Sequence, residues 1–190
     1  MDKQKQVLMK FAGIFIICAI VIFFFMHNQQ RSTVMTERGF SNEFHDSLNT
    51  TLAEEIKQLK IQLRNNPDSL ETLTQIGNHY FDINQPENAI TYYERAIKIK
   101  PDNAPVLTDC AVMYNQLGNS EKALDYLDKA IALRPDLAQA YFNKGVILMT
   151  AKNDPLGAVA VWKKFIEISP ESEYVDFLEQ QIKDIESAGQ

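Results

Sequence analysis

The side chains with the most scope for chemistry are three histidines and two cysteines, which could ligate a metal ion or act in nucleophilic catalysis. They are scattered along 190 residues, and no Cys/His pair stands at ligand spacing. The sequence also has no GxSxG elbow, phosphate-binding loop, HExxH motif or CxxCH motif. We therefore predict that the chain is not an enzyme, that it has no catalytic or metal-binding residues, and that it uses no cofactor.

Each of these residues also has a structural interpretation. His27 and His45 lie in a polar stretch, where solvation is expected and a metal or catalytic role is the alternative. His79 falls on a predicted helix, where we expect it to be packed or half-exposed. Cys110 occupies a helix-packing position and is expected to be a buried small hydrophobe, whereas Cys18 lies within an apolar run.

Composition and charge limit the class of protein. The chain has 190 residues, of which 45% are hydrophobic, enough for one soluble domain and a membrane segment. Two cysteines are too few for a disulfide scaffold. The net charge is -6, and because the first ten residues carry +2, residues 11–190 carry -8. Binding to a nucleic-acid backbone needs a basic face, so we predict no nucleic-acid partner.

An apolar run near the N-terminus predicts a membrane anchor. Residues 11–26 contain no charged or strongly polar side chain. With residues 7–10 they make 20 positions, which is about 30 Å of helix and matches a bilayer core. A cleaved signal peptide, a lipoprotein signal and a buried core helix are the alternatives, but no small residues mark a cleavage site. We predict an uncleaved signal anchor, a single transmembrane helix at 7–26 that follows a short basic tail at 1–6.

The charges that flank this run predict its orientation. Three lysines precede the run, whereas only Arg31 and Arg38 follow it closely. This bias favours a cytoplasmic N-terminus in the inner membrane and places the rest of the chain on the extracytoplasmic side, in the bacterial envelope. Residues 27–47 show no sustained apolar period and are predicted to be a polar tether.

The strongest signal is self-similarity with a period of 34 residues. Gly77, Ala111 and Gly145 lie 34 residues apart. Glycine and alanine at these positions allow two antiparallel helices to pack closely, and prolines end helices and begin turns. Small alanines and turn prolines recur at intervals of 34 or 35, at Ala89, Ala123 and Ala158 and at Pro67, Pro101, Pro135 and Pro170.

This pattern resembles the tetratricopeptide repeat (TPR), a helix-turn-helix unit that stacks into a right-handed superhelix. The resemblance covers three repeats, at 70–103, 104–137 and 138–171, and implies an all-α solenoid. The third repeat departs from the pattern by one extra residue before its second helix and by Phe165, where the other repeats have alanine. The packing residues that the resemblance implies are Gly77, Tyr80, Ala89, Ala96, Ala111, Tyr114, Ala123, Ala130, Gly145, Ala158 and Trp162.

The repeats, within residues 67–171, need caps because terminal repeats would otherwise expose an apolar face. Residues 48–66 are predicted to form an amphipathic N-terminal helix that begins at a capping box at 51–54. The register of this helix with Pro67 also makes it similar to a decayed second helix of a preceding repeat. Residues 172–190 are predicted to form a C-terminal capping helix and tail.

In the TPR family, the first helix of each repeat lines a concave groove that binds a partner. Carried onto this chain, the lining changes from polar and acidic to apolar, which suits a peptide or an amphipathic helix. The implied groove residues are Asn78, Phe81, Asp82, Val112, Asn115, Gln116, Phe142, Val146 and Met149. Phe142, Val146 and Met149 have a second interpretation, in which they pack against the capping helix.

Some members of the family clamp the C-terminal carboxylate of a chaperone with Lys and Asn. Here Thr74, Asp109 and Gln139 stand at positions where such a clamp needs those residues, so we do not expect this mode. The leading prediction is a membrane-anchored scaffold that binds a partner protein in envelope protein assembly. A narrower alternative is an apocytochrome c-binding factor, because the layout is similar to TPR proteins of bacterial cytochrome c maturation. A third alternative is a self-associating structural component of a membrane complex.

Overall fold

The computed structural model of the chain describes residues 38–188, with side chains from residue 50 onward. Within that range the chain forms eight helices and no strand, which confirms the predicted all-α solenoid. None of these helices combines the length and the apolar character that crossing a bilayer requires. The predicted anchor at 7–26 and the first part of the predicted tether, at 27–37, lie outside the described residues.

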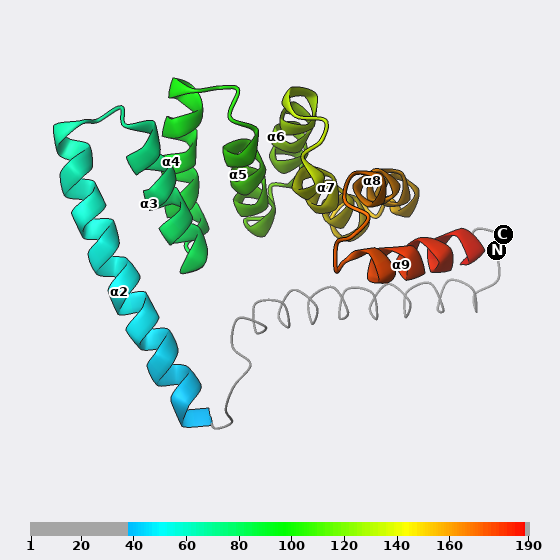
Figure 1. Cartoon of the computed structure of the whole chain (residues 1–190), viewed down its shortest axis with the longest axis horizontal. Coiled ribbons are helices and arrows are strands. Elements are labelled where there is room, and N and C mark those ends of the chain that lie inside the picture. Colours follow the sequence, from blue (N-terminus) through cyan, green and yellow to red (C-terminus); the bar gives the residue numbers. More distant parts are fainter. Residues whose placement is uncertain (1–37, 189–190) are drawn as a thin grey trace. The chain divides into compact units, whose positions relative to one another are not determined.

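Three helix pairs form the body of the compact unit made by residues 47–190 (Figure 1). In each pair two consecutive helices pack side by side, and the second helix of one pair packs on the first helix of the next. The elements are α2 (Arg38–Asn65), α3 (Leu70–Asp82), α4 (Pro86–Ile99), α5 (Ala104–Gln116), α6 (Ser120–Leu133), α7 (Ala138–Thr150), α8 (Pro155–Ile168) and α9 (Val175–Ala188).

The helix α2 is longer than predicted. It begins at Arg38, so the predicted tether is wrong for residues 38–47, and the capping box at 51–54 lies inside the helix. The sequence gives a reason, because Phe40, Phe44 and Leu48 extend the four-residue apolar spacing upstream. That spacing favours one continuous helix over a new start.

Both flanking helices cover an apolar end of the stack. In α2, Ile56 and Leu63 are buried in a cluster that includes the core residues of α3 and α4. In α9, Leu178 and Ile182 are buried in a cluster with residues of α7 and α8. The terminal pairs therefore do not expose the apolar faces that stacking would otherwise leave open.

The turn inside each helix pair depends on one residue in the left-handed region. These residues are Asn84 (φ 56°), Gly118 (φ 78°) and Asn153 (φ 51°). Glycine adopts this conformation freely, and asparagine tolerates it better than most side chains. The turn at 151–154 has four residues where the other two turns have three, so it accommodates the extra residue of the third repeat.

In each helix pair, a small residue of the first helix packs against a large residue of the second. Gly77 faces Tyr93 so closely that a Cβ on the glycine would lie 2.5 Å from the ring Cε1, and Gly145 faces Trp162 in the same way. The large partners are almost fully buried, at 1% exposure for Tyr93 and 0% for Trp162. Of the other packing residues predicted from the sequence, Tyr114 is half-buried. The rest are buried, and they are Tyr80, Ala89, Ala96, Ala111, Ala123, Ala130 and Ala158.

Enlarging a small residue at these contacts should destabilise the domain. Ala123 has 0% exposure in the core of α6, whereas Ala132 is exposed on the same helix. We expect Ala123→Leu to lower the free energy of unfolding by about 1–3 kcal/mol through overpacking. Ala132→Leu is the matched control and should change it by less than about 0.5 kcal/mol. Urea denaturation followed by circular dichroism measures both, and equal effects from the two variants would contradict this packing.

Candidate functional site

One side of α3, α5 and α7 stays at the surface while the other side enters the core. Residues at helical spacing share a face, and the nine residues predicted to line the groove follow that spacing. Three of the nine are exposed, six are half-buried, and none is fully buried. We call this surface the first-helix face, and its members are Asn78, Phe81, Asp82, Val112, Asn115, Gln116, Phe142, Val146 and Met149.

Hydrogen bonds within the chain orient the polar side chains of the first-helix face. The hydroxyl of Tyr93 donates to Asn78 Oδ1 at 2.8 Å, so the large packing residue of the first pair also positions a surface amide. Gln116 Nε2 donates to Asn84 Oδ1, which joins the second pair to the turn of the first. These side chains are therefore held in place before any partner arrives.

Asp109 is a site residue that the sequence analysis placed at a clamp position but did not include among the residues predicted to line the groove. It lies on α5, one turn from Val112, and its carboxylate is half-buried. Burial and the nearby charge of Asp82 raise the pKa of Asp109 to about 6. Among the described residues, no hydrogen bond or ion pair compensates this carboxylate. A sequence signal was present, because Asp109 is the only charged residue of α5.

A half-buried carboxylate without a partner opposes folding, because removal of the charge from water is not repaid by a hydrogen bond. Such a group marks a candidate functional site when it lies on a surface that other evidence singles out. Asp109 meets this condition, since it interacts electrostatically with Asp82 of the first-helix face and with Tyr93, which bonds to Asn78. A cationic group from outside the domain would complete this site.

The other end of the first-helix face is apolar and partly covered. The ring of Phe142 lies 5.0 Å from that of Tyr174, just before α9, and 5.6 Å from that of Phe165. Phe142 therefore packs against the capping segment, which is the second of its two predicted interpretations. Val146 and Met149 border the same cluster but remain half-buried, so they keep surface that a partner can contact.

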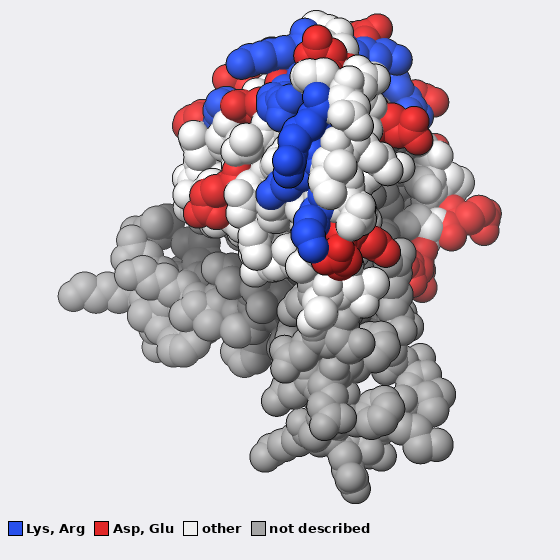
Figure 2. Space-filling view, turned by 90° about the vertical axis from the view of Figure 1, so that its left-hand side faces the viewer, with Lys and Arg blue, Asp and Glu red and all other residues white. Residues whose placement is uncertain are grey.

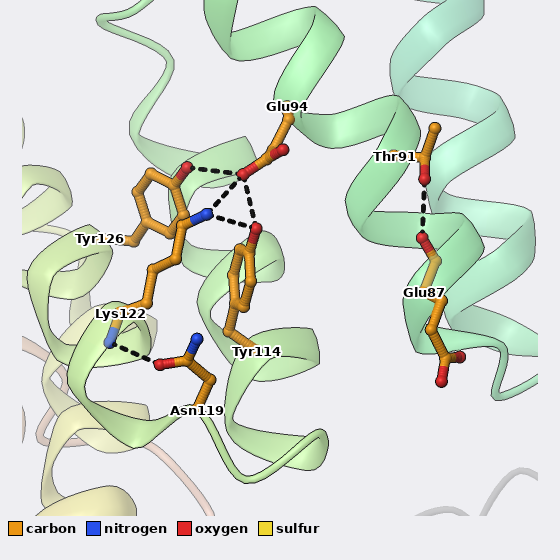
Figure 3. Close-up of polar contacts among 7 residues, drawn as sticks. All are labelled: Glu87, Thr91, Glu94, Tyr114, Asn119, Lys122 and Tyr126. Carbon is orange, nitrogen blue, oxygen red and sulfur yellow. Dashed lines mark hydrogen bonds and ion pairs between the residues drawn. The ribbon is translucent and has the colours of Figure 1, made fainter.

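A polar network holds the first two repeats in register (Figure 3). Lys122 of α6 donates to Glu94 of α4 at 2.8 Å and to the Tyr114 hydroxyl at 2.5 Å, and Tyr114 donates to the same carboxylate at 2.5 Å. Tyr126 adds a bond to Glu94 at 3.3 Å. Burial alone would raise the pKa of Glu94, but these donors outweigh it and leave the pKa below its ordinary value. Glu94 and Lys122 therefore neutralise one another.

His79 and Cys110, the histidine and the cysteine whose side chains the structure describes, both have a structural role. His79 is half-buried on α3, and its Nε2 lies 3.4 Å from Glu55 Oε2 of α2. Cys110 has 0% exposure, and burial raises the pKa of its thiol to about 12. A thiol in that state is a poor nucleophile at neutral pH. Cys110 is thus a buried small hydrophobe, as the sequence predicted.

These helix pairs define an α-solenoid, and family comparisons identify its repeat. Residues 70–103 match the family model described as tetratricopeptide repeat, and residues 111–152 match the model described as TPR repeat. The chain therefore contains tetratricopeptide repeats, which form scaffolds for protein–protein interaction. The second match ends before α8, the helix that follows the longer turn and carries Phe165. No curated protein matches the sequence.

Solved structures with the same fold include MamA and two domains described as TPR. A crystal structure of MamA has a TM-score of 0.63 at 20% identity, covering 82% of this chain and 96% of that chain. The first TPR of Spaghetti (RPAP3), bound to the HSP90 peptide SRMEEVD, has a TM-score of 0.57 at 23% identity, covering 63% and 91%. The Arabidopsis OM64 TPR domain has a TM-score of 0.57 at 20% identity, covering 61% and 95%. At these identities the likeness establishes the fold.

Replacing the uncompensated carboxylate should stabilise the domain. Because the folded pKa of Asp109 is raised to about 6, the folded state binds more protons than the unfolded state between about pH 4 and pH 6. The contribution of this group to the free energy of unfolding therefore falls as the pH rises through that window. Asp109→Asn should raise the free energy of unfolding at neutral pH by about 1–2 kcal/mol and flatten this dependence.

The exposed Asp125 of α6 provides the matched control for this variant. Asp125→Asn should leave both the neutral-pH stability and its pH dependence as they are in the parent protein. Urea denaturation at pH values on both sides of the window measures the effect. An Asp109→Asn protein that is less stable than the parent, or equally dependent on pH, would show that this carboxylate is compensated.

Proposed function

We propose that the chain is a scaffold that binds a segment of a partner protein across the first-helix face. The observation that carries this proposal is the uncompensated carboxylate of Asp109 beside Asp82. Natural domains retain destabilising groups where function needs them, and a TPR solenoid functions by protein binding. A cationic side chain of the partner would supply the counter-charge that Asp109 lacks.

The chemistry of the face defines the kind of segment that fits it. One end presents the carboxylates of Asp82 and Asp109, and the other presents the half-buried apolar side chains of Val146 and Met149. Val112 lies on α5, one turn after Asp109, and adds an apolar side chain to the face. The best match is an extended peptide or amphipathic helix that has a Lys or Arg at one end and apolar residues along one side.

This charge pattern differs from what an acidic peptide needs. The Spaghetti (RPAP3) structure contains the HSP90 peptide SRMEEVD, which has three carboxylate side chains. On the present chain, Asp82 and Asp109 would repel a peptide of that kind. We therefore propose a partner of the opposite charge, in keeping with Thr74, Asp109 and Gln139 at positions where a carboxylate clamp needs Lys or Asn.

Membrane anchoring is the second part of the proposal. The apolar run at 7–26 supports a single transmembrane helix, and the flanking charges support placement of the repeats on the outer side of the cytoplasmic membrane. Residues 27–37 would then connect the anchor to α2. In spheroplasts, external protease should remove the TPR domain, and full protection would contradict this orientation.

Site-specific photocrosslinking in cells tests the binding face. A photoreactive phenylalanine analogue replaces the exposed Gln116 on the first-helix face, and the control places it at the exposed Ala132 of α6. We expect an adduct with another protein from position 116, and no such adduct from position 132. Asp82→Lys/Asp109→Lys should reduce the adduct by about tenfold, because it replaces attraction of a basic partner by repulsion.

Three results would contradict the proposal. Equal adducts from positions 116 and 132 would mean that the first-helix face is not the binding surface. An adduct that withstands the double substitution would mean that the acidic pair does not contribute. An adduct made only of two copies of this chain would favour the self-associating alternative over a scaffold for a different protein.

A further inference from the structure

A second surface with binding chemistry lies between α2 and α3. A cleft of about 370 Å³ opens there, and it has three basic side chains, Lys57, Lys60 and Arg64, along one helix. Its remaining walls include the aromatic ring of Tyr80 and apolar side chains such as Ile83. In Figure 2, which looks at the α2 side of Figure 1, a row of Lys and Arg side chains runs down the surface. This row contrasts with the net charge of -6 for the whole chain.

The cleft is separate from the first-helix face. Successive residues of a helix are about 100° apart, so Tyr80 lies about 200° around α3 from Asn78. Asn78 belongs to the first-helix face, whereas Tyr80 lines the cleft. A partner segment on one surface therefore leaves the other surface free.

Lys60 is held in the cleft but lacks a negative partner. Its Nζ donates to the Tyr80 hydroxyl at 2.7 Å and lies 5.2 Å from the centre of the Tyr80 ring and 5.9 Å from that of Tyr92. Tyrosines orient an ammonium group without neutralising it. Among the described residues, neither Lys60 nor Arg64 has an ion pair, whereas Lys57 pairs with Glu54 at 3.1 Å.

The corresponding site in the next repeat contains an opposite charge, which the cleft between α2 and α3 lacks. Glu94 lies 34 residues after Lys60, and it likewise bonds to the tyrosine of the following helix, Tyr114. There Lys122 fills the corresponding space and neutralises the carboxylate, as Figure 3 shows. The residue 34 positions before Lys122 is Asn88, which donates instead to Gln85 Oε1 at 2.8 Å. The cleft between α2 and α3 thus keeps the positive charge of Lys60, whereas Lys122 neutralises Glu94 at the corresponding site of the next repeat.

We propose that the cleft between α2 and α3 binds an acidic side chain, Asp or Glu, from a segment of a protein partner. The carboxylate would occupy the space that Lys122 fills in the next repeat, close to Lys60, with Arg64 beside it. This second binding surface goes beyond the proposed function of the first-helix face and does not depend on it.

Two features favour a protein carboxylate over a lipid surface. Lys60 is half-buried, so its counter-ion must reach into the cleft on a flexible side chain. A flat bilayer surface would meet the outer ridge of α2 instead. Apolar atoms of Ile56, Ile83 and Tyr80 also line the cleft, and they suit the hydrocarbon part of a side chain more than a hydrated headgroup.

The test uses the full chain in detergent micelles and two short peptides. The probe is acetyl-Glu-Leu-Glu-Glu-Leu-amide, and its counterpart has glutamine in place of every glutamate. Amide chemical shifts of Tyr80 and Ile83, recorded by NMR during titration, report binding in the cleft. We expect saturable shifts with the glutamate peptide only, and affinity should fall several-fold between about 50 and 300 mM salt.

Matched variants assign the binding to the cleft. Lys60→Gln/Arg64→Gln should weaken binding by about tenfold or more. Lys98→Gln/Lys100→Gln removes the same charge from exposed positions outside the cleft and should leave the affinity unchanged. Arg64→Gln alone alters only an exposed side chain. If the Lys60 change perturbs the fold, the affinity of this single variant for the glutamate peptide tests the proposal.

Several results would overturn the proposal. They are equal binding of the glutamine peptide, equal loss in the control variant, and no cleft shifts at millimolar glutamate peptide. Two further titrations separate other anions from a protein carboxylate. Shifts with inorganic phosphate but not with the peptide would assign the cleft to a phosphate group. Binding to phosphatidylglycerol vesicles that needs Lys60 and Arg64, without peptide binding, would assign it to the membrane.

Discussion

The close approach of the two helices in each pair is the constraint on which the rest of the structure depends. Gly77 lies against Tyr93, Gly145 lies against Trp162, and the corresponding large residue of the middle pair, Leu127, is fully buried. Once these contacts fix each pair, its neighbours can stack only in a repeating order, and one side of every first helix stays outside the core. The positions of the small residues in the first helices therefore determine which surface remains available for binding.

The packed core also explains how the domain tolerates groups that oppose folding. The ring of Tyr93 packs between the two helices of the first pair, and its hydroxyl orients Asn78 by a hydrogen bond. Tyr93 also interacts electrostatically with Asp109. One residue thus connects the core to the first-helix face. The helix contacts supply stability that offsets two unfavourable groups. One is the uncompensated carboxylate of Asp109 on the first-helix face, and the other is the ammonium of Lys60 in the cleft, which has no ion pair within the described part of the chain. Both groups are available to partners because the scaffold does not neutralise them internally.

The sequence predicted the repeats because their packing depends on residue types at fixed spacing, as Gly77, Ala111 and Gly145 show. It misplaced the start of α2, since a local capping pattern at 51–54 looked like a helix start although the apolar spacing continues upstream. Asp109 was missed as a binding residue because its burial is created by neighbouring helices that a single helix pattern does not contain. The alternatives for Phe142 stayed open for the same reason, as its contact with Tyr174 joins different elements.

Carboxyl footprinting of the full chain, alone and with its crosslinked partner, measures whether the partner covers the acidic end of the first-helix face. A carbodiimide coupling labels accessible Asp and Glu side chains, and mass spectrometry reads the extent at each residue. We expect the partner to lower labelling of Asp82 and Asp109 by about tenfold, while Asp125 on α6 is labelled as before. Unchanged labelling of Asp82 and Asp109 in the complex would contradict the claim that this TPR scaffold binds its partner through the first-helix face.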